Sequence, residues 1–380
     1  MRPVVVLILH AAAPKDAGPL VRVLAEARHT LAERQRAAFV AAGADVAEVV
    51  AGPPDGLSFG ERLAAETRER TGGARGSAMP PGGLIVLGSG SIPLARAADL
   101  RRFVEVAAGP GGHALANNRY SADVVAISRA ADLAELPPLP VDNALPRWLE
   151  ERAGVAVTDL RSRWRLGVDV DTPLDLLLLG LGRSLAVADA AQNLHATAPL
   201  IGERLAALSD VLTNRRAELL VAGRVSTTTL RWLESGVACR VRALVEERGL
   251  RAASRLAQSG ATTGCRPPRS VLGELLDRDG PESLARTVAT LADAAVIDTR
   301  VLLAHRHGAD EAAWPAPEDR FASDLLLPAT IADPWLRALT ESAIASDLPI
   351  LLGGHTAVNG GLRLHAARAV LARRVRAGKR

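Results

Sequence analysis

The chain has 380 residues, more than a single hydrophobic core usually organises, so we expect two domains. Hydrophobic residues make up 48% of it and aromatic residues only 3%, which predicts a core built mainly from Ala, Val and Leu. The formal net charge of +4 comes from Arg interleaved with Glu and Asp, a solvated-surface pattern. This charge pattern, together with the small number of aromatic rings that could stack on bases, argues against nucleic-acid binding.

The first element in chain order is an apolar run at residues 3–12, typical of a strand buried on both faces. No small-residue cleavage site follows it, so we interpret it as a strand rather than a signal peptide and expect a cytoplasmic protein. No apolar stretch reaches the roughly 18 to 20 residues of a membrane span, so a membrane is not an expected partner. Cys239 and Cys265 lack metal-ligand spacing and are expected to be plain thiols.

The rest of the first half alternates between helical and strand patterns. This alternation predicts a mainly parallel, Rossmann-like sheet with right-handed crossovers. Residues 113–127 read as a polar loop that enters a strand, and 165–181 as a short strand, a turn and a helix. The other predicted elements are a helix at 20–42 ending at Gly43, a strand at 42–52, a helix at 59–70, a strand at 82–94 and a helix at 97–108.

Beyond about residue 195 the alternation starts again, so the fold class is α/β throughout. We expect a first domain at 1–192 and a second α/β domain at 193–380. The predicted elements of the second are a strand, polar loop and helix at 218–234, a strand or short helix at 239–249, and strands at 293–305 and 348–361, with irregular segments at 260–270 and 314–324.

The strongest chemical signal is the stretch DVDTPLDL, Asp169 to Leu176. Carboxylates at Asp169 and Asp171 can both face one cleft if the turn after the strand bends them together. Mg²⁺ is commonly held by one or two carboxylates together with substrate phosphates. The alternative is a helix cap, in which Asp171 or Thr172 satisfies free backbone N–H groups.

This stretch resembles the closing motif of nucleotidyltransferases with a glycosyltransferase-A-like fold, such as 2-phospho-lactate and molybdenum-cofactor guanylyltransferases. The resemblance covers about 190 residues. It implies that Asp169, with Asp171 beside it, holds the Mg²⁺ that bridges the nucleotide phosphates.

A second family position is LIVLGSGSIPLARAADL, Leu84 to Leu100. The family usually has Gly-x-Asp-x-Pro-Leu here, and its Asp is the other metal ligand. Gly88, Pro93 and Leu94 keep this frame, but Ser91 stands at the Asp position. The resemblance implies that Ser89 and Ser91 contact the nucleotide.

The loop after the first strand departs from the family as well. Family members usually carry a glycine-rich, basic loop there, whereas this chain offers LHAAAPKDAG with Lys15 as its basic residue. Lys15 is the candidate phosphate contact, and a solvated loop lysine is the alternative. The region where the family binds its accepting substrate holds Asn117, Asn118, Ser121 and Asp123, residue types that also form ordinary turns.

Three polar loops follow predicted strands of the second half, at 223–229, 298–300 and 353–361. If those strands are parallel, the loops meet at one edge of the sheet, where open α/β folds bind ligands. Helix capping and a glycine turn are the alternative. His305 and His307, two apart on a possible strand with Asp310 and Glu311 beyond them, are a weaker metal candidate. The ligand candidates at the edge are Arg224, Ser226, Thr227, His355 and Asn359.

Two hypotheses follow. The first is a magnesium-dependent enzyme that moves a nucleotidyl group from a nucleoside triphosphate to a small phosphorylated or carboxylated acceptor. The second is a protein of the same fold that has lost catalysis and binds a nucleotide or metabolite in a regulatory role, for which Ser91 and the shortened loop after the first strand are the evidence. Under either hypothesis the protein could form a homo-oligomer.

Overall fold

In the computed structural model the chain is an α/β protein, as the sequence predicts, with two mostly parallel sheets. It packs as two compact units. The first unit contains residues 1–16 and 25–170, and the second 17–24 and 171–380. The expected division between residues 192 and 193 lies outside the described residues. The structure describes residues 2–52, 59–71, 82–133, 136–137, 139, 144–180, 194–246 and 268–377.

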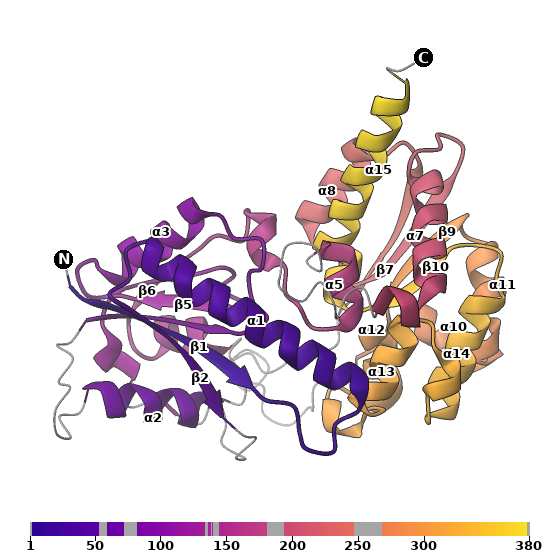
Figure 1. Ribbon diagram of the computed structural model, residues 1–380. Helices are drawn as coiled ribbons and strands as arrows, with labels where there is room; N and C mark the ends of the chain where they lie inside the picture. Colours follow the sequence, from indigo (N-terminus) through magenta and orange to yellow (C-terminus); the bar gives the residue numbers. More distant parts are fainter. Residues whose placement is uncertain are drawn as a thin grey trace. The chain divides into compact units, whose positions relative to one another are not determined.

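A six-stranded sheet in the order β2-β1-β3-β5-β4-β6 forms the middle of the first unit (Figure 1). Its strands are β1 (Val4–Ala11), β2 (Val46–Gly52), β3 (Gly83–Gly88), β4 (His113–Ala116), β5 (Val124–Ile127) and β6 (Ala156–Asp159). Its helices are α1 (Pro19–Ala41), whose first residues belong to the second unit, α2 (Phe59–Thr71), α3 (Ala97–Ala107) and α4 (Leu145–Glu151), with short 3₁₀ turns η1 (Ala130–Leu133) and η3 (Trp164–Gly167).

Both faces of this sheet are buried, which explains why β1 is a continuous apolar run rather than an alternating one. Val5 and Leu7 belong to one core cluster, which α2 and α4 cover. Val6 and Ile8 belong to the cluster on the opposite face, which α1 and α3 cover. Gly43, with φ of 104°, ends the region of α1, as predicted from its position after the periodic pattern.

Residues 113–127 form two strands where the sequence predicted one. β5 is antiparallel to both of its neighbours, β3 and β4. The connection from β4 to β5 is too short for a crossover to a parallel strand, so the chain reverses there. Likewise, the expected strand before Asp171 is reduced to a single bridge between Ser91 and Asp169.

The second unit contains a four-stranded, fully parallel sheet in the order β10-β9-β7-β8. The strands are β7 (Glu218–Gly223), β8 (Arg240–Val245), β9 (Ala294–Asp298) and β10 (Ile350–Gly353). The helices are α5 (Pro173–Leu179), α7 (Pro199–Leu212), α8 (Thr227–Gly236), α10 (Val271–Asp279), α11 (Leu284–Ala289), α12 (Thr299–His307), α13 (Pro317–Asp324), α14 (Pro334–Ala345) and α15 (Leu362–Ala377), with short turns η6 (Pro281–Ser283), η7 (Glu311–Ala313), η8 (Pro328–Thr330) and η9 (Ala357–Gly361).

Three of the predicted elements in this unit differ from the structure. The expected strand at 348–361 ends at Gly353, and the chain is helical from His355. The expected strand at 293–305 ends at Asp298, because the Asp298 side chain accepts from the N–H of Arg300 and caps α12. His305 and His307 therefore lie on a helix. The expected irregular segment at 314–324 contains α13, which begins at Pro317 with two carboxylates in its first turn.

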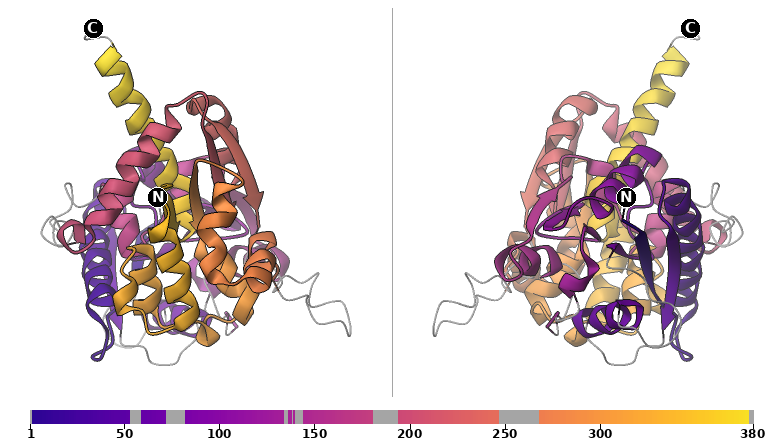
Figure 2. Two further views of the ribbon diagram at one scale, coloured as in Figure 1. Left: turned by 90° about the vertical axis from the view of Figure 1, so that its right-hand side faces the viewer. Right: turned by 90° about the vertical axis from the view of Figure 1, so that its left-hand side faces the viewer.

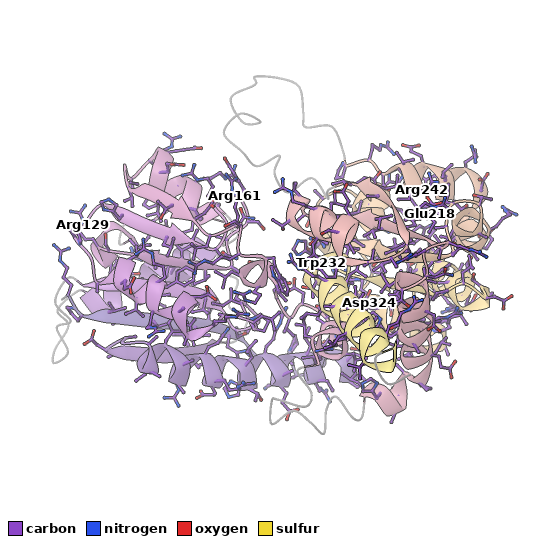
Figure 3. All side chains as sticks on the ribbon, turned by 90° about the horizontal axis from the view of Figure 1, so that it is seen from above. Arg129, Arg161, Glu218, Trp232, Arg242 and Asp324 are labelled. Atoms are coloured by element: carbon purple, nitrogen blue, oxygen red, sulfur yellow. The ribbon has the colours of Figure 1, made fainter. Side chains whose placement is uncertain are left out.

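The edge strand β8 carries exposed charges, which protect a free sheet edge from pairing with other chains. Arg242 lies beside Glu218 of β7, with 3.0 Å between the ion-pair atoms (Figure 3). At the end of the chain, the last turns of α15 extend beyond the rest of the second unit (Figure 2). Nearer its start, Arg368 of α15 donates to the carbonyls of Leu178 and Leu179 at the end of α5.

In the part of the chain that the structure describes, no helix has both the length and the apolar character that crossing a membrane requires.

Candidate functional site

The loop after β3 is joined to the chain that leads out of the first unit. Ser91 and Asp169 form an isolated antiparallel bridge, and the N–H of Val170 donates to the carbonyl of Gly90 at 2.9 Å. Residues directly opposite each other in such a bridge have their side chains on the same face, with Cβ atoms roughly 5 Å apart. The two positions singled out by the family resemblance therefore lie side by side.

Helix α1 holds both sides of this bridge. Arg28 Nε donates to the carbonyl of Val170 at 2.6 Å, and the Gln35 amide nitrogen donates to the carbonyl of Ser91. Arg28 and Gln35 are seven residues apart and so share one face of the helix. Neither residue was predicted from the sequence, because the partners of both lie in distant parts of the chain.

Backbone strain marks the same loop. Ile92 has φ of 42°, in the left-handed region, and its side chain is fully buried. A β-branched residue rarely adopts this conformation, and residues held in it cluster at functional sites. The contacts of Gln35 and the bridge to Asp169 hold the loop in this conformation.

A buried histidine lies at the carboxyl end of β1. His10 Nδ1 is 3.1 Å from Ser89 Oγ, and the His10 ring lies 5.1 Å from that of His29. Burial, with His29 and Arg28 nearby, lowers the pKa of His10, which therefore stays neutral at neutral pH. Ser89 thus contacts a side chain that the sequence analysis did not select, and Lys15 is exposed in the loop that follows β1.

The oxygen atoms beside the bridge suit a hard divalent cation. Asp169 supplies a carboxylate and Ser91 a hydroxyl. The Gln35 side chain is buried, and its amide oxygen, Oε1, has no hydrogen-bond partner among the residues that the structure describes. Carboxylate and amide oxygens are ligands that Mg²⁺ and Ca²⁺ accept. Among the described residues there is no group of three or more His, Cys, Asp or Glu that could hold a metal, so a site here depends on these mixed oxygens and on substrate phosphates.

Within DVDTPLDL, the helix-capping role falls on Thr172. Its side chain accepts from the N–H of Asp175, and Asp175 Oδ2 accepts from the N–H groups of Thr172 and Asp171 at 2.8 and 2.9 Å. The Asp171 side chain is exposed, and the N-cap residue of the helix is Thr172. Asp169 belongs to the first unit, whereas Asp171 begins the segment 171–380 of the second unit.

The polar cluster at 117–123 is held by its own hydrogen bonds. The Asn117 amide donates to Asp123 Oδ2 and to the carbonyl of Leu166, at 2.7 and 2.8 Å, and accepts from the N–H groups of Asp123 and Val124. Asn118 accepts from the N–H of Tyr120, as in an ordinary turn. Ser121 is exposed, and Asp123 is half-buried with its Oδ2 engaged by Asn117.

In the second unit, the three polar loops do meet at the carboxyl edge of a parallel sheet. Asn359 ties two of them together: Oδ1 accepts from the N–H of Ser226 at 2.7 Å, and Nδ2 donates to the carbonyls of Arg224 and His355. The Ser226 hydroxyl caps α8, whose first residue, Thr227, is exposed.

Charged side chains at this edge are paired with one another. Burial alone would raise the pKa of Asp298, yet the guanidinium of Arg224, with His355 and Arg300, holds it below the ordinary value. Arg300 in turn makes a bidentate pair with Asp324, at 2.5 and 2.6 Å. Of the five ligand candidates, Arg224, Ser226 and Asn359 thus have structural partners, and His355 is half-buried.

Cys239 is a buried thiol, and burial raises its pKa to about 11, in line with the expectation of a plain thiol. Cys265 lies outside the described residues.

No family model matches the chain, and no curated protein matches it.

Proposed function

We propose that the first unit is a nucleotidyltransferase-like domain that binds a nucleoside triphosphate with Mg²⁺ and moves its nucleotidyl group to a small phosphorylated or carboxylated acceptor. The bridge between Ser91 and Asp169 is the observation that carries the proposal. It brings together the two positions at which the resembling family holds its metal.

In this proposal, Asp169 is the carboxylate ligand, and Asp171 follows it two residues later. The bound Mg²⁺ would neutralise charge that develops on the α-phosphate. Gln35 offers a second oxygen where the family has a carboxylate at position 91, because its unpartnered Oε1 belongs to the amide that already bonds the Ser91 carbonyl. Ser89, Ser91 and Lys15 would contact the nucleotide, and Ser121 and Asp123 the acceptor.

The direct test is a titration of the purified protein with the four nucleoside triphosphates, with and without Mg²⁺. Triphosphate affinity that requires metal and disappears in Asp169→Ala supports the proposal. Pyrophosphate release over a panel of phosphorylated acids then identifies the acceptor class. Metal-indifferent triphosphate binding, unchanged in Asp169→Ala, contradicts a catalytic metal at this position.

Gln35 is tested by Mn²⁺ binding, measured by electron paramagnetic resonance. Gln35→Met removes the amide oxygen and should weaken Mn²⁺ binding. Arg28→Met is the matched control, because it removes a hydrogen bond from the same helix to the other side of the bridge, the Val170 carbonyl, without removing an acceptor oxygen. Ser91→Asp restores the family carboxylate and should tighten Mn²⁺ binding and make it less dependent on Gln35.

The second candidate function is a nucleotide- or metabolite-binding regulatory protein of the same fold. It is favoured by Ser91, because a neutral hydroxyl is a far poorer Mg²⁺ ligand than a carboxylate. Triphosphate binding without pyrophosphate release, in the wild type and in Ser91→Asp, would favour this second function.

A further inference from the structure

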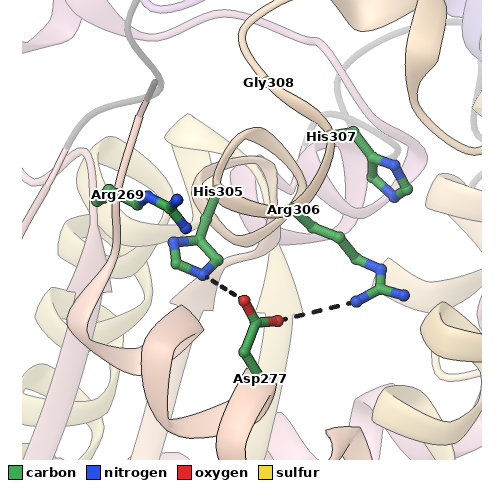
Figure 4. A pocket seen from close by; sticks show the side chains of 6 residues that line it. All are labelled: Arg269, Asp277, His305, Arg306, His307 and Gly308. Carbon is green, nitrogen blue, oxygen red and sulfur yellow. Dashed lines mark hydrogen bonds and ion pairs between the residues drawn. The ribbon is translucent and has the colours of Figure 1, made fainter. Parts of the chain in front are cut away.

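A pocket of about 470 Å³ lies in the second unit, beside α10 and the carboxyl end of α12 (Figure 4). Its volume falls in the range of small-molecule sites. The residues that line it are nearly all charged or polar: Arg269, Asp277, His305, Arg306, His307 and Gly308.

The hydrogen bonds of His305 exclude two common uses of a pocket histidine. Nδ1 accepts from the N–H of Ser270 at 3.1 Å, so Nε2 carries the proton and donates to Asp277 Oδ2 at 3.0 Å. Both ring nitrogens are therefore engaged, and only 1% of the side chain is exposed. His305 has no lone pair left for a metal or for a substrate proton, so its role is to orient Asp277.

Arg306 lies at the pocket wall, between an aromatic ring and a carboxylate. Its guanidinium lies over the Trp335 ring, 5.2 Å from the centroid, and 3.8 Å from Asp277 Oδ1. The side chain nevertheless remains 39% exposed. A guanidinium held in this way presents paired N–H groups, the geometry that binds carboxylate and phosphate in a bidentate manner.

The charge balance of the lining favours an anion. Arg269 adds a second guanidinium, 60% exposed and 3.6 Å from Glu274, an exposed ion pair of the kind that contributes little. The single carboxylate of the lining, Asp277, is already shared by His305 and Arg306. His307 adds a ring nitrogen, Nε2, that is shielded from solvent and has no hydrogen-bond partner in the described part of the chain.

Basic residues in the last turn of α12 also complement the helix dipole. That effect accounts for a positive charge at Arg306. It does not account for Arg269, which comes from the segment before α10, or for the position of Arg306 over Trp335.

We propose that this pocket binds the phosphate, or a comparable dianionic group, of a small metabolite. The site is separate from the one in the first unit and does not depend on the function proposed for it. Arg306 and Arg269 would hold the anion, and His305 would keep Asp277 in place against Arg306.

Inorganic phosphate is the probe, and isothermal titration calorimetry of the full chain is the measurement. Arg306→Gln should weaken phosphate binding roughly tenfold or more, because a charge-assisted bond is lost. Arg269→Gln should weaken it less, and its exposed position makes it a safe variant for folding. Asp277→Asn should strengthen phosphate binding, because the amide oxygen can still accept from His305 while the competing negative charge is gone.

Arg278→Gln is the matched control, since Arg278 lies on the same helix as Asp277, pairs with Asp279 and does not line the pocket. It should leave phosphate affinity unchanged. The proposal is overturned if the wild type does not bind phosphate at millimolar concentration, if Arg278→Gln weakens binding as much as Arg269→Gln, or if Asp277→Asn fails to strengthen it.

Discussion

The guanidinium of Arg224 donates two hydrogen bonds to the carboxylate of Asp298: Nε lies 2.6 Å from Oδ2 and Nη2 lies 3.1 Å from Oδ1. Asp298 is completely buried, whereas Arg224 is partly exposed. The pair joins the loop after β7 to the end of β9. An arginine that the sequence marked as a ligand candidate therefore neutralises a buried carboxylate at the carboxyl edge of the sheet.

Arg224→Met should lower the free energy of unfolding by about 3 kcal/mol, because it leaves the buried charge of Asp298 without its partner. Urea denaturation followed by circular dichroism measures the loss. Arg242→Met removes the exposed ion pair with Glu218 and should cost less than about 1 kcal/mol. Equal losses in the two variants would contradict the importance of burial at Asp298.

Asn117→Ala should be strongly destabilising, whereas Asn118→Ala should not. Asn117 is buried and its amide makes four hydrogen bonds, so its loss leaves buried partners unsatisfied and costs about 3 kcal/mol. Asn118 accepts one bond in an exposed turn, and its loss should cost less than about 1 kcal/mol. Thermal unfolding of both variants checks the difference, and a stable Asn117→Ala with weakened acceptor binding would instead indicate a substrate contact.

Much of the fold could be predicted because its signals are local in sequence. Continuous apolar runs such as that of β1 indicate strands buried on both faces, and Gly43 marks the end of a long helix. The meeting of three polar loops at one sheet edge followed from the parallel alternation alone. The reversal between β4 and β5 depends on loop length and strand pairing, which periodicity does not encode.

The partners of candidate residues could not be predicted, because they come from distant parts of the chain. Asp298 was seen as part of a loop, but its pairing with Arg224 spans 74 residues. Gln35 bonds a carbonyl 56 residues away, and nothing in its own helix distinguishes it from other polar positions. Long-range pairing decides whether a polar side chain is available to a ligand or already engaged.

Gly90→Ala should disturb the bridge between Ser91 and Asp169. A Cβ atom at Gly90 would lie 2.8 Å from the Val170 carbonyl oxygen and 3.0 Å from Arg28 Nε, so the backbone would have to move. We expect a loss of about 1 to 3 kcal/mol in stability, together with weaker Mn²⁺ binding. Gly167→Ala is the control, because no atom lies within 4 Å of a Cβ there, and it should change stability by less than about 0.5 kcal/mol.

Asp175 should make the stability of the protein depend on pH. Burial, with the nearby charge of Asp171, raises the pKa of Asp175 to about 7, and no described residue forms a hydrogen bond with its Oδ1. Below about pH 4 the carboxyl is protonated in both the folded and unfolded states. As the pH rises from there to about 7, the unfolded chain releases this proton and the folded chain keeps it, so stability falls over that window and levels off above it.

Asp175→Asn tests this dependence, because the amide oxygen can still accept from the N–H groups of Asp171 and Thr172. The variant should lose the Asp175 contribution to the fall in stability between about pH 4 and pH 8, which a shift of this size limits to about 4 kcal/mol. Urea denaturation at several pH values measures the slope for both proteins. Asparagine places an amide nitrogen at the position of Oδ1, which has a constant cost in stability, and comparing slopes rather than absolute stabilities removes that cost. Equal slopes in the two proteins would mean that Asp175 ionises normally in the folded state.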